Sequence, residues 1–495
     1  MGHKTKLGLG IIGIALVLGI IADSLLRTMP WGLNVALWTG FLALGILLVA
    51  HWQNIGLVGG GLWTVLPAIL FAGAFAWRDS QTLGLLNFLA LLATLTLVAL
   101  RLRSGQIFAM TITGLVTNAL MVGVSALLGT SALVFATIRW QEVPRTGLAG
   151  HGLAIARGLA ITVPLVIVFG SLFMQADAAF DGLVNRIFQF DLLDLLGHLT
   201  LIVALTWCAG GYLWLMLIEH RRADGVTIPI PGFQSLGAVE VSIVLGTLNA
   251  LFLAFVLVQF RYFFGGAELV EASITLTYAE YARRGFFELV TVAALVLPLL
   301  LTMDWLARKE NPRHLHIFRL LVALLVGLVF VIIVSAFQRM RLYQAEFGLT
   351  ELRLYTTAFM IWIAVVFLWF LGTVWRGKRE RFVFGMVMAG FLAIALLNWI
   401  NPDELIVHTN VGRASAERPL DAQYVAVLSA DAVPALLEAL PSIPEEDRQA
   451  IARNIQERWA NAANPDWRTW NWGRVQARAA SEAKQLLLSD IAATK

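Results

Sequence analysis

Residues 260–289 concentrate the charged and aromatic side chains that could do chemistry in this chain. They read FRYFFGGAELVEASITLTYAEYARRGFFEL, in which a glycine pair breaks the chain after an aromatic run. Helical spacing then places Tyr281, Arg284 and Glu288 on one face where the next apolar segment begins. Arginine offers bidentate donors and tyrosine a hydroxyl, so the stretch favours binding of an anionic headgroup or phosphate. A belt of Tyr and Arg anchors at a membrane surface gives the same pattern.

The composition is that of a polytopic α-helical membrane protein. Of 495 residues, 59% are hydrophobic and 14% charged, and the mean hydropathy is +0.76, whereas soluble domains carry roughly 25% charged residues. Continuous apolar runs argue against a β-barrel, whose strands alternate. The net charge of +4 indicates basic cytoplasmic loops rather than a nucleic-acid partner. The lipid bilayer is therefore the expected partner.

Apolar runs of bilayer length predict about twelve membrane-spanning helices of ~20 residues each. The first is read as an uncleaved helix, because no small-residue cleavage site follows its basic start. The expected spans are 7–22, 31–51, 55–76, 82–101, 107–138, 153–174, 197–218, 238–259, 285–305, 316–336, 356–374 and 382–400. Residues 107–138 are too long for one ordinary span, and their glycines Gly114, Gly123 and Gly129 would suit a broken or re-entrant pair.

Charges in the connections predict which side each faces. Basic clusters begin at residues 101, 139, 220, 308 and 376, and the positive-inside rule assigns them to the cytoplasm. The assignments agree if 107–138 crosses twice or re-enters. The stretch around Arg261, a loop at 338–355 and everything after residue 400 then share the outer side. The candidate ligand-binding residues there are Arg261, Tyr281, Arg284, Glu288, Arg339, Tyr343, Arg353 and Asn410.

Four strings carry a family resemblance: FRYFFGG, TYAEYARRGFFEL, RMRLYQAEFGLTELRLY and LSADAVPALL. Together they resemble a bacterial family of polytopic membrane proteins of the domain-of-unknown-function 4173 or 4153 type, over roughly residue 160 to the C-terminus. The resemblance implies a bacterial inner-membrane protein. It implies no activity, cofactor or catalytic residue.

The chain is expected to divide into N-terminal membrane helices at 1–150, a family-like membrane core at 151–400 and an extracytoplasmic helical tail at 401–495. Charges of both signs mix in the tail, and Ile451, Ile455 and Trp459 form one stripe of an amphipathic helix. A tryptophan group at Trp467, Trp470 and Trp472 could pack the tail onto the membrane surface or bind a planar ligand such as a sugar ring. Packing is the favoured interpretation.

Other chemical motifs are weak. Walker A, GxSxG, HExxH and CxxC sequences do not occur, so no cofactor is expected. His314 and His316 lie in a basic loop and are read as solvated rather than as a metal pair, so no metal is expected. Asn249, in the middle of a span, is expected to bond a neighbouring helix.

Three functions remain open on these residues. The first is binding or handling of an anionic or lipid-linked envelope ligand at the outer mouth, without catalysis. The second is a structural or signalling scaffold in which the same polar groups lock loops to the tail. The third is an envelope transferase with a lipid-linked donor and Asp23 or Glu288 as base, although the loop after Asp23 is short for such an enzyme.

Overall fold

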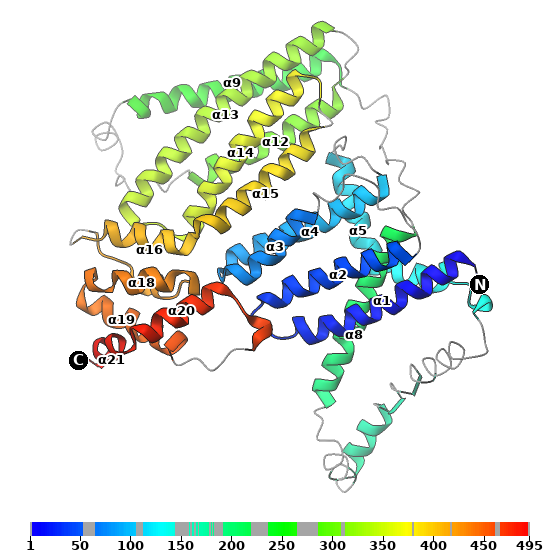
Figure 1. The fold of residues 1–495 in the computed structure, drawn as a ribbon. Coiled ribbons are helices and arrows are strands. Elements are labelled where there is room, and N and C mark those ends of the chain that lie inside the picture. Colours follow the sequence, from blue (N-terminus) through cyan, green and yellow to red (C-terminus); the bar gives the residue numbers. More distant parts are fainter. Residues whose placement is uncertain are drawn as a thin grey trace. The chain divides into compact units, whose positions relative to one another are not determined.

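The structure is a computed structural model that describes residues 2–52, 65–104, 112–143, 158, 161–162, 165–166, 168–177, 180, 182, 192–218, 236–264, 286–307, 312–378, 381–415, 418–460 and 466–493. The chain forms two compact units (Figure 1). The first comprises Met1–Ile69, Ala93–Gly105 and Thr117–Asp224. The second comprises Leu70–Leu92, Gln106–Val116 and Gly225–Lys495.

The first unit is built of long apolar helices. They are α1 (His3–Leu26), α2 (Leu33–Trp52) and α8 (Leu192–Leu217), with the second part of α4 (Gln81–Ser104) and most of α5 (Ile112–Ala132). A short 3-10 turn, η3, covers Trp140–Glu142. Leu7, Ile11, Leu18, Val49 and Leu213 lie in its buried core. Helices suit lipid because each satisfies its own backbone hydrogen bonds.

In the described part of 107–138, which begins at Ile112, the chain does not form the expected broken or re-entrant pair. From Ile112 to Ala132 the chain is one α-helix, which widens into the π-helical turn η2 at Leu133–Thr137. Gly129 does not break it, because this glycine lets α5 approach α8 closely. A Cβ at Gly129 would lie 2.9 Å from the Cα of Gly211. The glycine pattern therefore marks helix packing.

Five membrane helices form the main part of the second unit. They are α9 (Ala238–Phe264), α12 (Phe286–Leu306), α13 (Pro312–Phe347), α14 (Glu351–Trp375) and α15 (Phe382–Ile400), joined by most of α3 (Val65–Trp77) and the first part of α4. Val322, Val326 and Phe367 are buried among them. As predicted, Asn249 bonds a neighbouring helix, since its Nδ2 donates to the carbonyl of Leu321 at 3.0 Å.

The prediction of a loop at 338–355 is wrong. Helix α13 runs for 36 residues to Phe347, and at about 1.5 Å per residue it is longer than a hydrocarbon core of about 30 Å. Its last turns are polar, and no helix breaker stands before Gly348, whose φ is 76°. The connection to α14 is therefore a tight turn at 348–350.

The tail is helical, as predicted, but its core continues into the membrane helices. Its elements are α16 (Pro402–Arg413), α17 (Ala422–Ala426), η7 (Ala430–Ala432), α18 (Val433–Ala439), η8 (Leu440–Ser442), α19 (Glu445–Ile455), η9 (Gln456–Ala460), η10 (Trp467–Thr469), α20 (Trp472–Ala483) and α21 (Gln485–Ala493). Buried tail residues such as Ile451 and Ile455 share one cluster with Leu83, Leu349 and Leu397. The tail thus packs on the ends of α4, α14 and α15 and has no separate core.

In the described residues, ten helices are long and apolar enough to cross a membrane. Of the other two expected spans, Val65–Trp77 is a shorter apolar helix, and 153–174 lies partly outside the described residues. The fold is an all-α polytopic bundle with a small helical tail.

The close approach of α5 and α8 generates a stability prediction. Gly211→Ala should lower the free energy of unfolding by roughly 1–3 kcal/mol, because the added Cβ would lie 2.2 Å from the carbonyl oxygen of Ser125. Gly123→Ala, also on α5, is the matched control, because a Cβ there meets nothing within 4 Å. Thermal unfolding in detergent measures both. Equal midpoints for the two variants would contradict the packing role.

Candidate functional site

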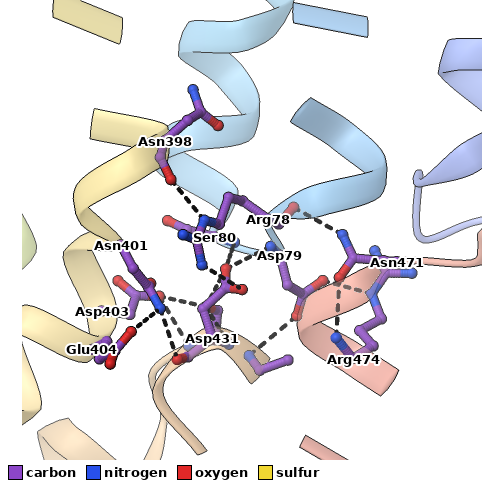
Figure 2. Close-up of polar contacts among 12 residues, drawn as sticks. Arg78, Asp79, Ser80, Asn398, Asn401, Asp403, Glu404, Asp431, Asn471 and Arg474 are labelled. Atoms are coloured by element: carbon purple, nitrogen blue, oxygen red, sulfur yellow. Dashed lines mark hydrogen bonds and ion pairs between the residues drawn. The ribbon is translucent and has the colours of Figure 1, made fainter. Parts of the chain in front are cut away.

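A network of charged and amide side chains joins the tail to the membrane helices within the second unit (Figure 2). It lies where the α3–α4 turn, the joint between α15 and α16, η7 with its N-cap residue Ser429, and the start of α20 meet. We call it the carboxylate clamp. Its members are Arg78, Asp79, Ser80, Asn398, Asn401, Asp403, Glu404, Ser429, Asp431, Asn471 and Arg474.

Two aspartates, Asp79 and Asp431, form the centre of the clamp by accepting hydrogen bonds from each other's segments. Asp431 Oδ2 accepts from the backbone N–H of Asp79 at 2.6 Å and of Ser80 at 3.3 Å. Asp79 Oδ2 accepts from the N–H of Ala430 at 3.2 Å. The N–H of Ser80 comes just before α4, so the Asp431 carboxylate also faces the positive end of that helix.

Arginine side chains complete this centre from two directions. Arg474 Nε, in the first turn of α20, donates to Asp79 Oδ1 at 2.6 Å. Arg78 Nη1 lies 3.8 Å from Asp431 Oδ1, while its Nε donates to the carbonyl of Asn398 at 2.7 Å. Arg78 thereby neutralises part of the charge and satisfies a carbonyl at the end of α15.

Asn471 attaches the start of α20 to the end of α3. Its Nδ2 donates to the carbonyls of Phe75 at 2.8 Å and Arg78 at 2.9 Å, and its Oδ1 accepts from the N–H of Arg474 at 3.1 Å. One buried amide therefore caps two helix ends.

The second part of the clamp contains oxygens with no hydrogen-bond donor. Ser429 donates through Oγ and N–H to Asp403 Oδ2 at 2.5 and 3.3 Å. Asn401, at φ 55°, donates from Nδ2 to the carbonyl of Asp431 at 3.2 Å. Asp403 and Asp431 are only 1% and 6% exposed. The Oδ1 atoms of Asn401, Asp403 and Asp431 are nevertheless left without a hydrogen-bond partner among the described residues.

Burial changes the acidity of these two carboxyls. It raises the pKa of Asp403 to about 6, and the charges of Glu351 and Asp431 add to the shift while hydrogen bonds from Ser429 oppose it. Burial raises the pKa of Asp431 to about 6 as well, against the opposing effects of the Asp79 N–H and the Arg78 guanidinium. The clamp can therefore take up protons near neutral pH.

Among the described residues, no three His, Cys, Asp or Glu side chains are placed to hold a metal ion. The arrangement can titrate, and it can hold the tail.

Three of the eight predicted ligand-binding residues have internal partners where α13 ends beside the tail. Arg353 donates from Nη1 to the carbonyls of Phe347 at 3.0 Å and Gly348 at 2.5 Å, and its guanidinium lies 4.1 Å from the ring centroid of Tyr343. Asn410 exchanges two hydrogen bonds with the backbone of Leu349, at 2.6 and 2.8 Å. These groups hold the α13–α14 turn to α16.

The other candidates are less fully described. Arg339 Nη2 donates to Gln259 Oε1 at 3.3 Å, across α13 and α9. Glu288 is exposed in the first turn of α12, and Arg261 belongs to α9. Tyr281 and Arg284 lie outside the described residues. A ligand role for the eight stays a prediction.

The centre of the clamp is not among the residues predicted from the sequence. Two sequence features pointed to it. Arg78 and Asp79 are a charged pair directly after an apolar run, and Asp431 belongs to the family-like string LSADAVPALL. Arg474 and Asn471 gave no such signal, because polar residues are ordinary in a soluble helical segment.

Asp23 lies in the first unit, in contact with α8. Its Oδ2 is 2.6 Å from His198 Nδ1, and His198 Nε2 is 3.6 Å from Asp194 Oδ2. Asp194 also pairs with Arg27. Asp23 Oδ1 is buried without a hydrogen-bond partner among the described residues. One oxygen of the aspartate is thus held by a histidine of α8.

The clamp predicts a pH dependence of stability. A carboxyl whose folded-state pKa lies above its usual 3.8 holds its proton more tightly in the folded protein. The stabilisation that this proton provides, measured as free energy of unfolding, is full below about pH 4 and is lost as the pH rises through about 6. Asp403→Asn removes this titration, so the wild type should lose on the order of 1–3 kcal/mol relative to the variant between pH 4.5 and 7.

Thermal unfolding of both proteins across this pH range measures the difference. Glu438→Gln is the control, because Glu438 is exposed on α18 of the same tail. Parallel pH profiles for wild type and Asp403→Asn would contradict the titration of the clamp.

Comparison with known proteins identifies a family. The chain matches the domain of unknown function DUF4153 over residues 65–439, so the match begins before the expected residue 160 and ends before the C-terminus. It includes Asp79, Asp403 and Asp431 but not Asn471 or Arg474. No curated protein matches. No solved structure matches either. Because the match covers well over half of the 495 residues, the chain belongs to the DUF4153 family of unknown function and is an integral membrane protein of that family.

Proposed function

We propose that this protein is a membrane scaffold, structural or signalling, whose helical tail is clamped to the ends of its membrane helices. The observation that carries the proposal is the reciprocal pair of Asp79 and Asp431, held by Arg474. Buried charged hydrogen bonds of this kind fix one arrangement, since breaking one partner leaves the other uncompensated. A signal that opens the clamp would change the position of the whole tail.

We propose that the tail faces outward in a bacterial cytoplasmic membrane. The turns that leave α14 and enter α13, at the ends remote from the tail, carry Arg313, Arg376, Lys378 and Arg381. The positive-inside rule favours the cytoplasm for short loops of this charge. These charges all belong to the second unit, so the proposed orientation of the tail does not depend on residues 107–138.

The partners of the predicted ligand-binding residues support a scaffold over an anion receptor. The side chains of Arg353 and Asn410 already form hydrogen bonds with the backbone of the α13–α14 turn. A group that already satisfies a buried carbonyl gains little by turning to a ligand, because the carbonyl would then lose its partner. An anionic or lipid-linked ligand at the mouth would depend on Arg261, Tyr281, Arg284 and Glu288.

The scaffold predicts that the tail opens when Arg474 loses its charge. Arg474→Gln removes the ion pair with Asp79, so amide hydrogen exchange in α18–α20 should accelerate at least tenfold, while exchange in α13 and α14 stays unchanged. Arg453→Gln is the matched control, because Arg453 is exposed on α19 of the same tail. Hydrogen exchange of the purified full chain in detergent, read by mass spectrometry, measures both.

Unchanged protection of α18–α20 from hydrogen exchange in Arg474→Gln would contradict the proposal that the clamp holds the tail. The anion receptor would be favoured instead if phosphatidylglycerol raised the unfolding temperature of the wild type and failed to do so in Arg284→Gln.

A second candidate, an envelope transferase with a lipid-linked donor, is favoured by the geometry of Asp23. A buried carboxylate bonded to His198, with its second oxygen unpartnered, has the form of a general base. It predicts transfer of radiolabel from a polyprenyl-phosphate sugar to membrane material by the wild type, and loss of at least 100-fold in Asp23→Asn. Equal incorporation in both proteins would remove this candidate.

A further inference from the structure

We propose that the segment Trp467–Trp472, here called the tryptophan loop, lies in the headgroup region of the lipid bilayer beside the end of α3. The partner is the membrane surface itself. The inference goes beyond the scaffold, because it concerns what the tail touches outside the protein.

The loop is attached directly to the apolar helix α3. Asn471, between Trp470 and Trp472, is 1% exposed and bonds the carbonyls of Phe75 and Arg78. Phe75 belongs to the last turn of α3, which ends at Trp77. Residues on either side of Asn471 therefore lie beside the C-terminal end of α3.

The depth of that point is marked by other tryptophans. Trp77 ends α3, and Trp399 stands one residue before the end of α15. Arg78 ties the two helix ends together by bonding the carbonyls of Asn398 and Trp399. Trp77 is 42% exposed and Trp399 77% exposed. Exposed tryptophans at the ends of adjacent membrane helices form an aromatic belt at headgroup level.

The side chains of the loop have the chemistry of the same belt. Trp467, Trp470 and Trp472 are 63%, 42% and 44% exposed, although Thr469 and Asn471 between them are buried. The backbone is thus fixed while the indoles face outward. An indole has an apolar ring and one N–H donor, so it is stabilised where apolar chains meet water. Arg468 pairs with Asp466 beside the indoles and places charge of both signs at the level of the headgroups.

Planar-ligand stacking is the competing explanation for three exposed indoles. It requires them to stay in water until the ligand binds. The attachment to α3 favours the membrane, because it holds the loop at the helix end whether or not a ligand is present.

Spin-label depth measurement tests the proposal on the full chain in vesicles of phosphatidylethanolamine and phosphatidylglycerol. Cys208 is the single cysteine, so Cys208→Ser gives a background for single labels at Trp467→Cys and Trp470→Cys. Trp399→Cys is the membrane reference, and Arg453→Cys on α19 is the aqueous reference. Relaxation by oxygen, which prefers the bilayer, is compared with relaxation by a water-soluble nickel chelate.

The oxygen-to-nickel ratio at 467 and 470 should lie closer to that at 399 than to that at 453, and several-fold above the latter. Ratios closer to that at 453 would overturn the proposal and return the loop to water, where a planar ligand could stack. A second measurement uses no cysteine. Brominated lipids should quench the fluorescence that Trp467→Phe and Trp470→Phe remove, and unquenched emission from these two residues would also overturn it.

Discussion

The structure depends on a constraint that every membrane helix meets at its end, where the last carbonyls and the first amides have no partner within the helix. In this chain the tail supplies several of those partners. Asn471 bonds carbonyls at the end of α3, and Asp431 accepts amides before the start of α4. Asn410 does the same for the turn after α13. The tail is therefore positioned by backbone groups of the membrane helices, which explains why its apolar core is continuous with theirs.

Meeting that constraint with carboxylates has a cost in desolvation. Asp403 and Asp431 are nearly inaccessible to water, and the acidic groups around them exceed the two arginines of the clamp, Arg78 and Arg474. Both effects push the pKa of each carboxyl upward. A clamp made of amides alone would satisfy the same helix ends without this penalty. Helix capping therefore does not require the excess of acid at this site, and that excess accounts for part of the upward shift in both pKa values.

The sequence predicts some levels of this structure well. Runs such as Phe286–Leu306 are long, apolar and bounded by charge, so their helical state follows from composition. The apolar stripe that contains Ile451 and Ile455 is also predictable, because helical periodicity depends only on residues a few positions apart in the sequence. Turn positions are harder, as α13 shows by continuing to Phe347 through residues that read as a polar loop. Partners at long range are not predictable from periodicity, because Asn471 meets Phe75 across nearly 400 positions and no local pattern encodes that pairing.

The same reasoning distinguishes a side chain that binds a ligand from one that stabilises the fold. Arg353 looks identical in sequence whether it awaits a phosphate or bonds a carbonyl, since both roles require a guanidinium near a helix end. Only the surrounding backbone distinguishes them. At Arg353 two carbonyls and the ring of Tyr343 already surround the guanidinium, so an incoming anion would have to compete with three contacts that cost nothing in translational entropy. Polar residues clustered at a helix mouth therefore argue for a ligand only after the helix ends themselves have been satisfied.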